Sequence, residues 1–109
     1  MNKRPDADKA PTAADHEALE QWLRTQFGPE PVGRRAYPDE HFIYPYPAQR
    51  GPPSYTIEVT QEAYEFETGA QIAAQLDRQG IADRLRREPR VHLRYQSGGR
   101  VVPSPAQPS

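Results

Sequence analysis

The sequence predicts a small α+β domain, and three observations support that fold class. One apolar stripe at helical spacing follows residue 12, a second follows residue 68, and apolar residues alternate with polar ones at 55–59 and 91–95. The order of these segments predicts an N-terminal helix, a proline-rich aromatic crossover, and a mostly antiparallel sheet of three to five short strands packed on one central helix. A length of 109 residues allows one such domain.

The first helix is predicted to begin after Thr12, whose hydroxyl can accept from the amides of the first turn. Asp15 lies in that turn, where an acid interacts favourably with the helix dipole. Gly28 and Pro29 end the helical pattern, because a left-handed glycine followed by proline is a common helix stop. The apolar stripe comprises Ala14, Ala18, Leu19, Trp22 and Leu23.

Residues 29–54 contain seven of the 13 prolines of the chain. Proline excludes a continuous helix here and permits short extended or polyproline pieces. Residues 41–44 fit a short edge strand, since Pro45 and Pro47 cannot donate to a central ladder. We expect the segment to lie along the surface, with some of its aromatic rings docked on the core. These rings belong to Tyr37, Phe42, Tyr44 and Tyr46.

Residues 60–67 fit two structures. Tyr64 and Phe66 alternate with glutamates, which favours a second strand or extended arm directly after residues 55–59, and this is our prediction. Ala63 and Phe66 also share one face of a helix with later alanines, so a helix is the alternative.

The central helix is predicted to begin at Thr68, because Thr68 and the glutamine three residues later have the spacing of a capping box. Ile72 and Leu76 form the stripe that would cover the sheet. Gly80 fits the left-handed position that closes a helix. Residues 81–87 then form a second short helix or a bent continuation of the first.

The last part of the domain reads as a β-hairpin. Residues 91–95 alternate in polarity, residues 96–99 end in two glycines and fit a hairpin loop, and residues 100–102 fit the return strand. Pro103 stops that strand.

Both ends of the chain are predicted to be disordered. Residues 1–11 and 103–109 are rich in proline, charge or small polar residues and show no periodicity. The folded domain is therefore expected to span residues 12–102. A domain of this size buries a modest fraction of its surface, so dimerisation would add stability and is a reasonable expectation.

The composition excludes several classes of protein. The chain has no cysteine, which excludes disulfides, thiolate metal sites and a cysteine nucleophile. It has no apolar run of the length that a signal peptide or a membrane span needs. We therefore expect a cytoplasmic protein without membrane contact.

The net charge of −1 hides an uneven distribution. Residues 54–77 hold five acids and no base, whereas residues 78–109 hold seven arginines and two acids. Arginines beside an aromatic ring can bind phosphates and stack bases, so nucleic-acid binding is the alternative functional hypothesis. The competing interpretation pairs these arginines with acids such as Glu58 across neighbouring strands. The nucleic-acid candidates are Arg84, Arg86, Arg87, Arg90, Arg94, Tyr95 and Arg100.

The leading hypothesis is a non-enzymatic adaptor or regulatory module that binds another protein. Aromatic residues held by prolines lose little entropy on binding and supply amphipathic anchors. Tyr37, Phe42, Tyr44 and Tyr46, or the open sheet edge beside them, are the candidate contacts. This hypothesis predicts an exposed apolar patch that contains at least two of the four rings.

A third hypothesis is a small enzyme or metal-binding protein around His16, Glu20 and His41. His16 and Glu20 lie four residues apart on one helix face, a spacing that metal ligands use. The sequence supplies no third ligand at a matching spacing, no nucleophile–base motif and no phosphate-binding loop. We therefore predict no enzymatic activity, no cofactor and no metal site.

Overall fold

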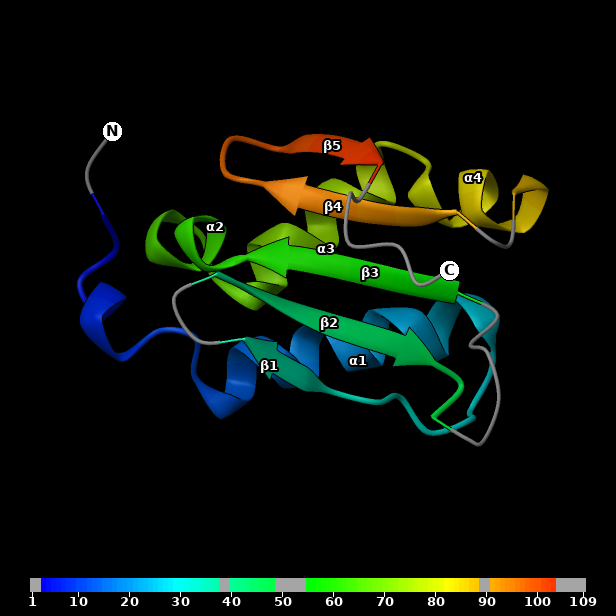
Figure 1. Ribbon diagram of the computed structural model, residues 1–109, viewed down its shortest axis with the longest axis horizontal. Coiled ribbons are helices and arrows are strands. Elements are labelled where there is room, and N and C mark those ends of the chain that lie inside the picture. The colour runs from blue at the N-terminus through cyan, green and yellow to red at the C-terminus, as the bar shows by residue number, and fades with distance from the viewer. Residues whose placement is uncertain (1–2, 38–39, 49–54, 89–90, 104–109) are drawn as a thin grey trace.

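The computed structural model describes residues 3–37, 40–48, 55–88 and 91–103 (Figure 1). Of the tail predicted to be disordered at 103–109, Pro103 is instead the last residue of a strand, and residues 104–109 lie outside the described residues. The helices are the 3-10 helix η1 (Ala7–Lys9), α1 (Ala13–Phe27), α2 (Gln61–Phe66), α3 (Gly69–Arg78) and α4 (Ile81–Arg87). The strands are β1 (Arg35–Tyr37), β2 (His41–Tyr46), β3 (Tyr55–Thr60), β4 (His92–Gln96) and β5 (Arg100–Pro103).

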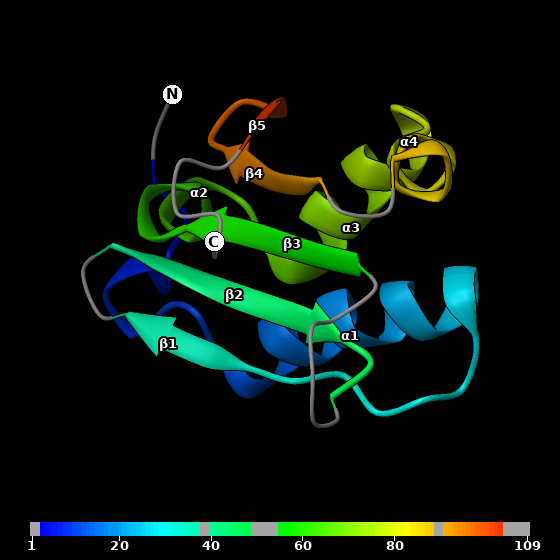
Figure 2. The same ribbon diagram turned by 45° about the vertical axis from the view of Figure 1, so that its right-hand side comes forward.

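The strands form one five-stranded sheet in the order β1-β2-β3-β4-β5, which confirms the predicted α+β class. Neighbouring strands are antiparallel except β3 and β4, which run parallel and are joined through α2, α3 and α4. Figures 1 and 2 show the helices α1 and α3 stacked behind the sheet. We call the side of the sheet that they cover the helix face and the opposite side the second face.

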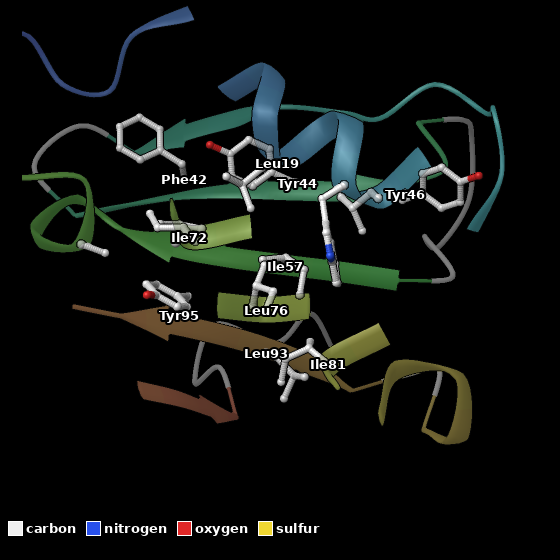
Figure 3. Packing of buried hydrophobic residues seen from close by; sticks show 14 of the residues in the cluster. Leu19, Phe42, Tyr44, Tyr46, Ile57, Ile72, Leu76, Ile81, Leu93 and Tyr95 are labelled. Atoms are coloured by element: carbon white, nitrogen blue, oxygen red, sulfur yellow. The ribbon is translucent and has the colours of Figure 1, made fainter. Parts of the chain in front are cut away.

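The hydrophobic core lies between the helix face and the helices (Figure 3). Ile72 and Leu76 of α3 are fully buried, which confirms the predicted covering helix. The cover is shared, however, because Leu19 and Leu23 of α1 are also fully buried and α1 packs along α3. Several helices, rather than one central helix, therefore close the core, because α2 and α4 also contribute buried residues to it.

The predicted helix boundaries are confirmed where the sequence supplies local capping groups. The Thr12 hydroxyl accepts from the amide of Asp15, and the Asp15 carboxylate accepts in return from the amide of Thr12. Thr68 and Gln71 form the same reciprocal pair at the start of α3. Gly80 adopts a left-handed φ of +68° between α3 and α4, so the two helices are separate.

The predicted strand at residues 60–67 is wrong, because Gln61–Phe66 forms the helix α2. The hydroxyl of Thr60 accepts from the amide of Ala63 and caps this helix. The helix buries Ala63 and Tyr64 completely, whereas Glu65 stays partly exposed. The helical alternative, which places Ala63 on the buried face, is the structure that forms.

The proline-rich segment contains more regular structure than its composition suggests. β2 is longer than predicted and is not an edge strand, because β1 pairs with it on its outer side. The carbonyl of Pro45 accepts from the amide of Gly33, so the backbone groups of Pro45 point away from β3. The N–H that Pro45 lacks would point to the same side, beyond the end of β1. Proline is therefore tolerated here, because the ladder between β2 and β3 loses no hydrogen bond.

The N-terminal residues differ from the expectation of disorder. The side chain of Arg4 is only 8% exposed and lies 3.0 Å from the Asp15 carboxylate, which is itself buried. The same guanidinium donates to the carbonyls of Tyr64 and Glu67. The guanidinium of Arg4 thus joins the residues before the first helix to α1 and to the end of α2, through contacts that no local sequence pattern indicates.

Candidate functional site

Three of the four aromatic candidates belong to the core (Figure 3). Phe42, Tyr44 and Tyr46 are 7%, 0% and 3% exposed, because alternate residues of β2 all face the helices. The Tyr46 hydroxyl donates to the carbonyl of Gly28 over 2.6 Å. The exposed patch of two or more rings is therefore not formed. Tyr37, 42% exposed, is the only large hydrophobic residue exposed among those described.

Tyr37 lies on β1, which forms one outer edge of the sheet. All three residues of β1 are exposed. Arg35 pairs with Ile43 and Tyr37 with His41, and the amide of Gly33 continues this ladder by donating to Pro45 over 2.8 Å. Peptide groups alternate in direction along an extended strand, so the N–H and C=O groups of Ala36 point away from β2.

We call the extended residues 33–37 the β1 edge. No hydrogen bond joins Ala36 to another described residue on the outer side of this edge. The edge therefore offers an exposed donor and acceptor pair to a further strand, which is the property that lets a sheet bind an extended chain.

The side chains of the β1 edge point to both faces of the sheet. Arg34 reaches the helix side, where its Nε lies 2.8 Å from an oxygen of Glu20 on α1. Arg35 lies on the second face, is exposed, and makes no ion pair with another described residue. The Tyr37 ring packs on the His41 ring with 4.7 Å between their centroids. The edge thus presents two guanidinium groups and one aromatic ring.

The candidates for nucleic-acid binding are divided between two sides of the sheet. Arg84, Arg86 and Arg87 belong to α4, in the helical layer (Figure 2). Arg86 lies 2.8 Å from Asp83, and its guanidinium stacks over the Phe27 ring at 5.2 Å. These contacts hold Arg86 in the helical layer, and Arg84 lies 3.8 Å from Glu88 at the end of the same helix.

The other basic candidates lie on the β4–β5 hairpin. Arg94 and Arg100 belong to the second face, whereas Tyr95 is fully buried on the helix face and donates to Glu67 over 2.7 Å. Burial is the main cause that raises the pKa of Tyr95. Arg90 lies outside the described residues. The structure therefore does not bring the predicted arginines together on one open face.

Arg94 is paired within the sheet, as the competing interpretation predicted. Its Nε donates to the carboxylate of Glu58, the directly neighbouring residue on β3, and Glu58 is 1% exposed. The Nε2 of His41 lies 3.8 Å from the other carboxylate oxygen. A buried carboxylate is costly unless it is paired, so Arg94 compensates a charge inside the domain.

His16, Glu20 and His41 do not converge. His16 lies on α1 between the helices and the sheet, and its Nδ1 is 2.7 Å from the Tyr44 hydroxyl. The Tyr44 hydroxyl is in turn hydrogen-bonded to the Tyr64 hydroxyl. His41 lies on the second face, opposite Thr60. Burial lowers the pKa of His16, which keeps its ring neutral within this network. The described residues contain no group of three side chains suited to hold a metal ion.

A polar groove at the end of the sheet was not predicted from the sequence. It lies where β3 and β4 end, and its charged groups are partly satisfied internally: Ser97 donates to Glu62 over 2.8 Å, and Lys3 lies 3.3 Å from Glu65. No sequence signal marks this groove, because four separate segments contribute to it. It is lined by Glu40, Thr60, Gln61, Glu62, Glu65, Gln96, Ser97 and Arg100.

Comparisons with protein-family models, with curated proteins and with solved structures gave no match. Among the described residues, none of the helices has the length and apolarity needed to cross a bilayer. Function is therefore inferred from the geometry of the chain itself.

Proposed function

We propose that this protein is a small adaptor or regulatory module that binds an extended segment of another protein along the β1 edge. The bound segment would pair with the outward N–H and C=O groups of Ala36 and extend the sheet by one strand. In this mode of recognition main-chain hydrogen bonds supply affinity and alternate side chains supply specificity. The unpaired outward backbone at Ala36 is the observation that carries the proposal.

The β1 edge suits a specific partner better than the opposite edge does. β5 ends on Pro103, which has no amide to donate, and its valines are half-buried. β1 has three exposed residues, including the Tyr37 ring. Its short length and its arginine are features with which proteins prevent indiscriminate edge pairing, so a partner would need complementary side chains.

Nucleic-acid binding has less support. A phosphate-binding face needs several arginines on one surface. Arg86 is held in the helical layer beside Phe27, and Arg94 is paired with the buried Glu58 on the second face. Nucleic-acid binding is therefore one outcome of the binding experiment below and not a second proposal.

One substitution tests the proposal directly. Ala36→Pro removes the outward amide while leaving the amides of Arg35 and Tyr37, which point toward β2, in place. Ala36→Val keeps the outward amide and is the matched control, because valine suits a strand. Both variants must keep the circular dichroism spectrum and the urea midpoint close to those of the wild type.

The measurement starts with partners captured on the immobilised wild-type protein. Cross-linking and mass spectrometry identify the contacting segment of the partner, and a synthetic peptide of that segment is titrated by NMR. We expect amides of the β1 edge to shift, and Ala36→Pro but not Ala36→Val to abolish binding. Equal binding by the proline variant would refute the proposal, and a nucleic acid whose retention falls steeply with salt would favour the alternative hypothesis.

A further inference from the structure

Two neighbouring arginines determine the chemistry of the β1 edge. Because adjacent residues of an extended chain point to opposite faces, Arg34 reaches the helix side and Arg35 the second face. Arg34 is 39% exposed at its side chain although it contacts Glu20, and Arg35 is exposed as well. A strand added at Ala36 would therefore meet one guanidinium group on each face.

The carboxylates of the chain itself leave these donors available. Glu20 takes only the Nε of Arg34, whose terminal nitrogens donate to no other described residue. Glu40, the acid that follows β1 most closely among the described residues, lies 3.9 Å from His41 instead. Arg35 thus has no acidic partner within the described part of the chain.

From this arrangement we infer that the partner segment is acidic, with two adjacent carboxylate side chains on the added strand. This inference rests on the proposed function of the β1 edge. Two adjacent carboxylates would point to opposite faces, one toward Arg34 and one toward Arg35. The planar guanidinium group offers paired donors that match a carboxylate, which gives such a contact geometric selectivity.

A second copy of this chain fits the same edge less well. The peptide groups of Gly33 and Arg35 point toward β2. Because peptide groups alternate in direction along a strand, those of Arg34 and Ala36 point outward. An antiparallel pair of edges centred on either arginine would place it directly opposite the same arginine of the other copy, and a pair centred on Ala36 would place Arg35 opposite Tyr37, which offers it no carboxylate. Like charges that face each other across two strands are destabilising.

The test uses three synthetic heptapeptides and the purified ¹⁵N-labelled protein. The peptides share a frame of alternating valine and threonine, and their two central residues are both glutamate, both glutamine or both lysine. At about 50 mM salt we expect the glutamate peptide to bind about threefold to tenfold more tightly than the glutamine peptide, as two exposed ion pairs allow. The lysine peptide should bind most weakly, and about 500 mM salt should shrink the differences.

Variants connect this preference to Arg35. Arg35→Gln should reduce the preference for glutamate over glutamine to about twofold to threefold, because one of the two ion pairs is lost. Arg100→Gln, which removes an exposed arginine from β5 at the opposite edge, should leave the preference unchanged. Equal affinity of the wild type for the glutamate and glutamine peptides would overturn the inference.

Other outcomes separate this inference from the proposed function. If the glutamine peptide shifts the amides of the β1 edge and Ala36→Pro abolishes that binding, the proposed function holds even when no acidic preference is found. If the proline variant binds every peptide as the wild type does, the proposed function itself fails. A dimer in sedimentation equilibrium that Ala36→Pro dissociates would place a second copy on the edge and overturn the acidic partner.

Discussion

Replacing Arg4 by alanine should destabilise the protein strongly, although Arg4 lies in a segment that the sequence predicts to be disordered. The side chain is 8% exposed and contacts Asp15 at 3.0 Å, where the carboxylate is 4% exposed. It also donates to the carbonyls of Tyr64 and Glu67 at 3.3 and 3.1 Å. The substitution therefore removes three contacts to parts of the chain that are distant in sequence.

The contacts of Arg4 set the expected magnitude. Removing one partner of a buried ion pair costs about 3–5 kcal/mol, because it leaves an uncompensated charge. Asp15 keeps two donors, however, the amides of Thr12 at 2.8 Å and Gly69 at 2.9 Å. The alanine variant also recovers up to about 2 kcal/mol of side-chain entropy that ordering arginine had cost. We therefore expect the free energy of unfolding to fall by about 2–3 kcal/mol.

Urea denaturation, followed by circular dichroism and by the fluorescence of Trp22, measures this loss. Lys3→Ala is the control, because Lys3 also contacts an acid, Glu65 at 3.3 Å, but its side chain is 58% exposed. An exposed pair of this kind contributes at most about 1 kcal/mol. Arg4→Lys keeps the charge without the planar fork and should fall between the two.

A loose N-terminal segment would give a different result. In that case Arg4→Ala and Lys3→Ala would agree within about 0.5 kcal/mol, which is the usual range for surface substitutions. This outcome would refute the buried position of Arg4 and the contacts argued from it.

Three further perturbations follow from the packing and the titratable groups. Gly69→Ala would place a Cβ 2.6 Å from the Cα of Asp15, which is backbone and cannot swing aside, so thermal unfolding should show a loss of about 3 kcal/mol or more. Thr68→Ala removes the cap of α3 and should cost about 1 kcal/mol in urea denaturation, with the exposed Thr25→Ala as the comparison. Burial lowers the pKa of His16 and of His92 below 6.5, so the unfolded chain binds protons at these two residues more readily than the folded chain does. The free energy of unfolding should therefore fall as the pH drops below about 6.5 toward the folded-state pKa values. Substituting both histidines by glutamine should flatten this pH dependence, as measured by urea titrations at several pH values.

Helix boundaries could be predicted because their determinants are local. Thr12 and Thr68 each cap a helix by contacts within three residues, and Gly28 and Gly80 stand at positive φ where helices end. The helix α2 was not predicted, because the polarity of residues 60–67 alternates as it does in a strand. Tertiary packing decides that segment, because the helix buries Tyr64 completely and brings its hydroxyl to that of Tyr44.

The buried position of Arg4 had no local signal. Besides the Asp15 carboxylate, its distant acceptors are carbonyls 60 and 63 residues away in the chain, and backbone carbonyls carry no residue-specific pattern. Low apolar content and frequent proline give residues 1–11 an intrinsic preference for disorder, which the long-range hydrogen bonds of Arg4 override.

The position of the candidate site depended on register, which the sequence does not encode in one place. The even-numbered residues of β2, Phe42, Tyr44 and Tyr46, all face the core, so the odd-numbered ones carry the peptide groups that pair with β1. The bond from Gly33 to Pro45 fixes that phase, and the phase leaves Ala36 pointing outward. A shift of one residue would instead expose the peptide groups of Arg35 and Tyr37 and turn their side chains onto the helix side. The proposed site thus follows from the register of β1 on β2, and Ala36→Pro tests that register as directly as it tests binding.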